Sequence, residues 1–238
     1  MSTFVLIHGA WHGGWCWYKV IPLLEKKGHT VLAPDLPGHG RDKTPVSAVS
    51  LQMYVDRVCQ LLDAQRDPVV LVGHSMGGSM VITQAAEYRP HKIQTLVYVA
   101  ARLLRNGESS LSAGQGDPES LLRPNLVFVP DRSSVTVREE ALKGVFYGDC
   151  SAEDVALAKT LLVPEAVALL ATPVHTSAEN FGRLPRVYIE CLRDQALPPA
   201  VQKRQYTSLP CQKVISMATS HSPFFSAPEE LVEHLVSL

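Results

Sequence analysis

The sequence predicts a protein of the α/β class, in which helices flank a mostly parallel sheet and a mainly helical cap is inserted. Strand-like and helix-like patterns alternate as far as residue 101. This alternation is interrupted between residues 102 and 183 and resumes from residue 184 to the end. Such alternation implies right-handed crossovers between parallel strands. We therefore expect one structural unit, with an α/β core at residues 1–101 and 184–238 and a cap at residues 102–183.

The predicted strands are short apolar runs, as expected of strands that helices cover on both faces. The predicted helices lie between these strands, except for the last one, which follows the final strand. In chain order, we expect strands over residues 3–7, 30–33, 69–72, 93–99, 186–191 and 212–216, and helices over residues 15–27, 51–65, 79–88 and 228–238.

The insertion at residues 102–183 has a different pattern. Residues 107–120 (GESSLSAGQGDPES) are predicted to be a loop, whereas Ser151 and Asp154 form a capping box that begins a helix. Pro164 is predicted to begin a second short helix, PEAVALLA, because proline is tolerated at the first helical position. Open α/β folds bind ligands at the carboxyl ends of their strands, so we expect the cap to cover that edge.

Composition indicates an ordinary globular protein. The chain has 238 residues, a net charge of −1 and no run of like charges, so neither nucleic acid nor a membrane surface is an expected partner. Its five cysteines show no C-x-x-C spacing, which favours reduced thiols over a disulfide framework or a zinc site. The start, MSTFVLIHGA, has no basic region typical of a signal peptide, and the expected location is cytoplasmic.

The most informative motif is G-x-S-x-G at residues 73–77, between a buried strand and a helix. A turn this tight forces its central residue into a strained conformation, and glycines on either side prevent collisions with the neighbouring backbone. The motif therefore predicts that Ser75 is a nucleophile. The backbone N–H of Met76 would lie at a helix N-terminus beside it, where it can stabilise an oxyanion.

A serine nucleophile needs a base, which is usually an imidazole oriented by a carboxylate. His221 lies just after the strand that ends near Ser216 and is the predicted base. His234 lies inside the last helix and His175 in the cap, so both are poorer candidates.

The predicted acid is Asp194, which directly follows the strand at residues 186–191. Glu190, inside that strand, remains a rival. Asp35 is expected to stabilise a turn. The other candidates lie in the cap, where a structural role is expected: Asp117, Asp149 and Asp154.

The second oxyanion donor is expected in the loop that follows the first strand, VLIHGAWHGGW. We assign it to the backbone N–H of Ala10. His8 and His12 are four residues apart, but on a strand and loop their rings need not share a face, so we expect them to support the loop. No metal and no cofactor are expected.

With these residues in place, the chain resembles the α/β-hydrolase superfamily, and within it the plant-type methylesterase and hydroxynitrile lyase group with its bacterial esterase relatives. The similar segments are HGAWHGGWCWYKVIPLLEKKGHTVLAPDLPGHG, GHSMGG, YGDCSAEDVALAKTLLVPEA, RVYIECLRDQALP and SHSPFF. The resemblance implies a catalytic triad of Ser75, Asp194 and His221, an oxyanion hole of Ala10 and Met76, and a possible homodimer.

Two positions help to distinguish the two chemistries of that group, ester hydrolysis and hydroxynitrile cleavage. The similar lyases carry a threonine where this chain has Gly9 and a lysine where it has Ser222. The resemblance therefore implies a serine carboxylesterase that cleaves a small or medium apolar ester through an acyl-enzyme. A hydroxynitrile-lyase-type or other carbon–carbon cleaving enzyme and a ligand-binding receptor are the alternatives. Candidate lining residues for the substrate pocket are Trp11, Leu126, Phe128, Phe146, Leu161, Leu162 and Val174.

Overall fold

The computed structural model describes the backbone of residues 1–238 and the side-chain surroundings of all of them except residue 116. A six-stranded sheet with the order β2-β1-β3-β4-β8-β9 forms its centre, and all neighbouring strands are parallel. The strands are β1 (Thr3–Ile7), β2 (Thr30–Leu32), β3 (Val69–His74), β4 (Ile93–Val99), β8 (Arg186–Cys191) and β9 (Lys213–Met217). The predicted α/β class is confirmed.

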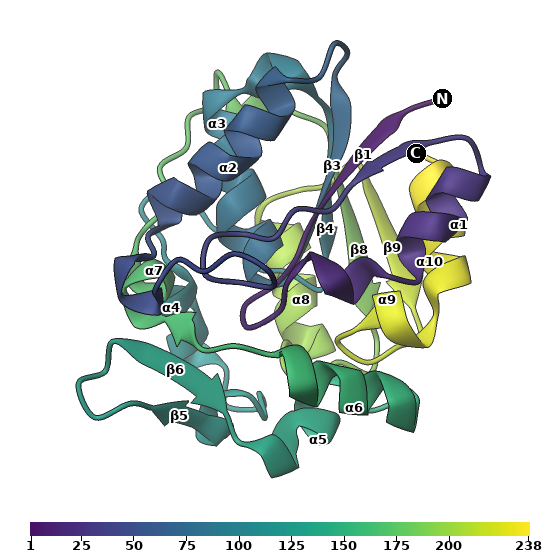
Figure 1. Ribbon diagram of the computed structural model, residues 1–238. Helices are drawn as coiled ribbons and strands as arrows, with labels where there is room; N and C mark the ends of the chain where they lie inside the picture. Colours follow the sequence, from purple (N-terminus) through teal and green to yellow (C-terminus); the bar gives the residue numbers. More distant parts are fainter.

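Helices cover both faces of this sheet, and α1 and α10 lie on the side opposite to α2 and α3 (Figure 1). The helices of the core are α1 (Val20–Lys26), α2 (Leu51–Asp63), α3 (Thr83–Tyr88), α8 (Pro199–Ser208), α9 (Pro223–Ser226) and α10 (Pro228–Val236). Every residue of the central strand β3 is buried, which explains its uninterrupted apolar pattern.

The cap lies between β4 and β8 in the chain and at one end of the sheet, away from both termini (Figure 1). Its helices are α4 (Ser110–Ala113), α5 (Leu142–Phe146), α6 (Ala152–Leu161) and α7 (Val167–Ala171). It also contains a small antiparallel sheet of β5 (Leu126–Phe128), β6 (Ser134–Val137) and β7 (Glu165–Ala166), which the sequence pattern did not predict.

Four predicted elements differ from the structure. The predicted helix at residues 15–27 is a short 3₁₀ helix, Gly14–Trp17, followed by α1, which begins only at Val20. The segment after Pro164 is first the strand β7, because it pairs with β6, and it becomes helical only at Val167. The predicted loop at residues 107–120 contains α4, which a capping box at Ser109 begins. The predicted helix at residues 79–88 begins instead as a π-helix, Gly77–Ile82, and continues as α3.

Helix α6 begins after Ser151 as predicted, and the hydroxyl of Ser151 accepts the N–H of Asp154 at 3.1 Å. The predicted capping box is incomplete, because the carboxylate of Asp154 accepts the Ser151 hydroxyl instead of its backbone N–H. Cys16, Cys59, Cys150 and Cys191 are buried free thiols, in keeping with the expectation of reduced thiols. Among the described residues, no helix has the length and apolar character needed to span a bilayer.

Candidate active site

The turn after β3 holds Ser75 in a strained backbone conformation. Its φ of 50° lies in the left-handed region, which is costly for any residue with a side chain. A Cβ added to Gly77 would lie 2.2 Å from the carbonyl oxygen of His8, and one added to Gly73 would lie 2.5 Å from the Cα of Gly78. The two glycines are therefore required by the close approach of the backbone on either side of the serine.

The carboxyl end of β8 supplies Asp194, and the carboxyl end of β9 supplies His221. The Nδ1–H of His221 donates to Oδ2 of Asp194 at 2.7 Å, and both side chains are buried. The other carboxylate oxygen, Oδ1, accepts the backbone N–H groups of Ala196 and Leu197, each at 2.8 Å. Gln202 donates to Oδ2 at 3.2 Å. This set of donors fixes the carboxylate and, through it, the orientation of the imidazole.

Two further contacts position the loop that carries His221. The Nε2–H of His74 donates to the carbonyl oxygen of His221 at 2.8 Å, and the two rings lie 4.7 Å apart. Burial, together with the nearby imidazole of His221, lowers the pKa of His74, so its ring stays neutral. From the cap, the carboxylate of Asp149 accepts the backbone N–H of Ser220 at 2.9 Å.

The rival candidates have other partners. Glu190 accepts the hydroxyls of Ser216 and Tyr206, at 2.6 and 3.0 Å. His234 pairs with Glu230 on its own helix, at 3.7 Å. Asp35 accepts the backbone N–H groups of residues 14 and 41, which is the turn-stabilising role expected of it.

The loop after β1 carries Ala10, and the rings of His8 and His12 support it. His8 donates from Nδ1 to Gly9 and accepts the N–H of Leu36 at Nε2. His12 donates from Nδ1 to the carbonyl oxygen of Ala10 at 2.8 Å and accepts the hydroxyl of Tyr147, from the cap, at 2.7 Å.

Neither of these two imidazoles has a free ring nitrogen. Burial is the main cause that lowers the pKa of His12 to about 4, and it also lowers the pKa of His8. Both rings are therefore neutral donors and acceptors. In the described part of the chain, no group of three or more His, Cys, Asp or Glu side chains could hold a metal ion.

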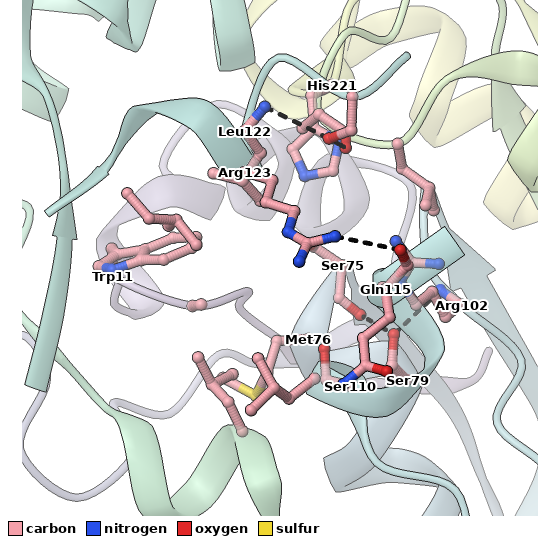
Figure 2. A pocket seen from close by; sticks show the side chains of 18 of the residues that line it. Trp11, Ser75, Met76, Ser79, Arg102, Ser110, Gln115, Leu122, Arg123 and His221 are labelled. Atoms are coloured by element: carbon pink, nitrogen blue, oxygen red, sulfur yellow. Dashed lines mark hydrogen bonds between the residues drawn. The ribbon is translucent and has the colours of Figure 1, made fainter. Parts of the chain in front are cut away.

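A cavity of about 390 Å³ opens between this edge of the sheet and the cap. Ser75, His221, Ala10 and Met76 line its floor, and Figure 2 shows Ser75 and His221 facing it from separate segments. Met76 precedes the first turn of a helix, where backbone N–H groups have no intrahelical partner.

Three of the predicted pocket residues line this cavity: Trp11, Leu126 and Phe128. The other four do not. Phe146 is buried behind the wall, with its ring 5.7 Å from that of Trp11 and 5.5 Å from that of His221. Val174 is buried in the core, Leu162 packs against the core, and Leu161 is exposed.

Several residues of the cavity wall were not predicted from the sequence. The polar and charged ones among them are Ser79, Arg102, Ser110, Gln115, Ser120, Arg123 and Arg132. Most belong to the cap, and no motif marks them, because contacts between distant segments decide which cap side chains point inward.

Fold and site together define an α/β protein of hydrolase architecture, with a serine at the turn after the central strand and a cap over the strand ends. The chain belongs to the alpha/beta hydrolase family, whose model matches residues 4–234. This confirms the resemblance inferred from the sequence.

Three relatives illustrate the similarity. A putative chloroplastic methylesterase of Arabidopsis thaliana (methylesterase 11) is 35% identical over all of this chain and 64% of its own length. The pyrethroid hydrolase of Sphingobium wenxiniae is 33% identical, over 98% of this chain and 86% of its own. The crystal structure of polyneuridine aldehyde esterase superposes with a TM-score of 0.90 at 28% identity, covering 100% of this chain and 98% of that one. The chain spans only 56% of the length of two other plant methylesterases.

Proposed function

We propose that the protein is a carboxylic ester hydrolase that uses Ser75, His221 and Asp194 as a catalytic triad. The observation that carries this proposal is the shared cavity: a strained serine and an imidazole face it together, and the imidazole is bonded to a buried carboxylate. The substrate is a small or medium ester with an apolar body, because Trp11, Leu122 and Phe128 supply apolar surface around the serine.

In this mechanism the hydroxyl oxygen of Ser75 attacks the ester carbonyl carbon while Nε2 of His221 takes its proton. Asp194 keeps the other ring nitrogen protonated and stabilises the imidazolium that forms. The backbone N–H groups of Ala10 and Met76 donate to the oxyanion. The imidazolium protonates the departing alcohol, and water then releases the acid from the acyl-enzyme by the same steps.

The names of the relatives agree with this chemistry, since they include methylesterases, a pyrethroid hydrolase and polyneuridine aldehyde esterase. The structure also speaks against the lyase alternative. A Cβ at position 9 would lie 2.8 Å from the ring of His74 and 3.0 Å from the Cβ of Ser75, so this site has no room for a threonine. The residue after His221 is the fully buried Ser222, which provides no positive charge for a leaving cyanide.

The test is hydrolysis of p-nitrophenyl acetate and butyrate. We expect Ser75→Ala to lose at least about a thousandfold in kcat/KM, as loss of a triad member commonly does. Ser208→Ala, an exposed serine at the end of α8, is the matched control and keeps the wild-type rate. An unchanged rate in Ser75→Ala would refute the proposal. Release of cyanide from mandelonitrile that depends on Ser75 would instead favour the lyase.

A further inference from the structure

The wall of the cavity is positively charged. Three arginines line it, Arg102, Arg123 and Arg132, and none of its described lining residues is an aspartate or a glutamate. The guanidinium of Arg102 pairs with the buried carboxylate of Asp117, which offsets part of its charge. That same carboxylate also pairs with Arg204, at 3.0 Å, so it has no charge left to offset the other two arginines.

Arg123 and Arg132 have no acidic partner within 4.0 Å in the described part of the chain. Arg123 donates from Nη1 to the carbonyl oxygen of Gln115 at 3.0 Å. The guanidinium of Arg132 lies 4.6 Å from the centre of the Phe128 ring. A guanidinium carries five N–H donors, so each has donors left for a ligand.

Arg123 is placed to meet a substrate. It lies at the start of the turn that leads into β5, and Figure 2 shows its side chain extending from the cap into the cavity, on the side that faces Ser75. A neutral apolar ester filling this cavity would cover part of the guanidinium without giving it an acceptor, and this desolvation is unfavourable. An ester with an anionic group at its far end would instead provide charge-assisted hydrogen bonds.

We propose that the cap side of this cavity is a carboxylate-binding subsite, and that the substrate is an ester with an apolar body and a second, ionised carboxylate. Arg123 binds that carboxylate, and Arg132 adds to the positive potential at the same wall. The proposal rests on the ester hydrolase function above and narrows its substrate class.

Two pairs of esters test it, and in each pair one member has an ionised carboxylate where the other has an uncharged carboxamide. The first pair is the mono-p-nitrophenyl ester of adipic acid and its ω-carboxamide, which places the anion on the acyl side. The second is 4-acetoxybenzoate and 4-acetoxybenzamide, which places it on the alcohol side. For each pair the measured quantity is the ratio of kcat/KM for the anionic ester to kcat/KM for the neutral one.

In at least one pair we expect Arg123→Gln to lower this ratio about tenfold, an effect between those of exposed and buried charge-assisted hydrogen bonds. Arg123→Lys keeps the charge but loses the planar fork, so its ratio falls between wild type and Arg123→Gln. Arg138→Gln removes the same charge from an exposed cap residue outside the cavity and leaves the ratio unchanged. The pair that responds identifies the side of the ester that carries the anion.

The carboxylate subsite is refuted if Arg123→Gln leaves both ratios unchanged, or if Arg138→Gln lowers them equally, since the effect would then be one of net charge. Failure of the underlying function gives a different result. In that case the wild-type protein hydrolyses none of the four esters in a way that depends on Ser75.

Discussion

Replacement of Asp194 by asparagine tests the geometry of the site most directly, because the two side chains have the same shape. The aspartate makes four hydrogen bonds: Oδ1 accepts two backbone N–H groups, and Oδ2 accepts His221 and Gln202. An asparagine has one oxygen for these donors, so one side of the amide must present an NH₂ group.

The hydrogen bonds around position 194 decide whether the NH₂ group takes the place of Oδ1 or of Oδ2. With its NH₂ at the Oδ1 position, the amide would face the N–H groups of Ala196 and Leu197, and two buried donors would lose their acceptor at about 1–3 kcal/mol each. With its NH₂ at the Oδ2 position, it faces His221 and Gln202, and Gln202 keeps other acceptors in Cys191 and Leu197. The second orientation is therefore favoured by several kcal/mol, and it donates to Nδ1 of His221.

An imidazole that accepts at Nδ1 carries its proton at Nε2, where it cannot take the proton of Ser75. We expect kcat to fall by about 10⁴-fold, while the thermal unfolding temperature changes little, because the two backbone N–H groups keep their acceptor. The assay is p-nitrophenyl butyrate hydrolysis beside a circular dichroism melt of the same preparation. A loss of less than about tenfold in kcat would show that the tautomer of His221 does not matter, and would contradict the assignment of Asp194 as the acid.

Two further predictions concern stability. Gly77→Ala places a Cβ against the rigid carbonyl oxygen of His8, so we expect the free energy of unfolding in urea to fall by about 2–3 kcal/mol. The control Gly144→Ala, whose Cβ meets nothing within 4 Å on α5, should not be destabilised, and equal losses would contradict the steric argument. Burial alone would lower the pKa of His39, but the carboxylate of Glu165, 3.3 Å away in the cap strand β7, outweighs it and raises that pKa above 6.5. The stability from this pair is complete below pH 6.5 and is lost as the pH rises through the raised value. Urea midpoints between pH 5.5 and 9 should show this loss in the wild type and not in Glu165→Gln, and parallel curves would refute it.

The core could be predicted from the sequence because its elements are specified locally. The predicted bounds of β1, β4 and β8 equal those in the structure, since each strand is a short and mainly apolar run. Ser75, Asp194 and His221 follow strands of the same sheet, and parallel order alone brings such strand ends to one edge.

The cap could not be predicted in the same way. Pro164 and the residues after it have the composition of a helix, yet Glu165 and Ala166 pair with Val135 and Ser134, about thirty residues earlier in the chain. Which side chains of the cap face the cavity depends on such pairings between distant segments. The sequence therefore suggested Phe146 and Val174 as lining residues because they are apolar, and gave no reason to choose Arg123.

The cap is hydrogen-bonded to the loop that carries Ala10. Trp11 has a φ of 64°, a left-handed conformation that costs about 1 kcal/mol or more for a residue with a side chain. Two cap bonds stabilise it: its indole N–H donates to Val135 at 2.8 Å, and its carbonyl oxygen accepts the N–H of Val163 at 3.0 Å. The hydroxyl of Tyr147 orients His12, which in turn donates to the carbonyl oxygen of Ala10. These bonds fix the peptide groups on either side of Trp11, so the cap helps to hold the loop that carries the proposed oxyanion donor, the N–H of Ala10.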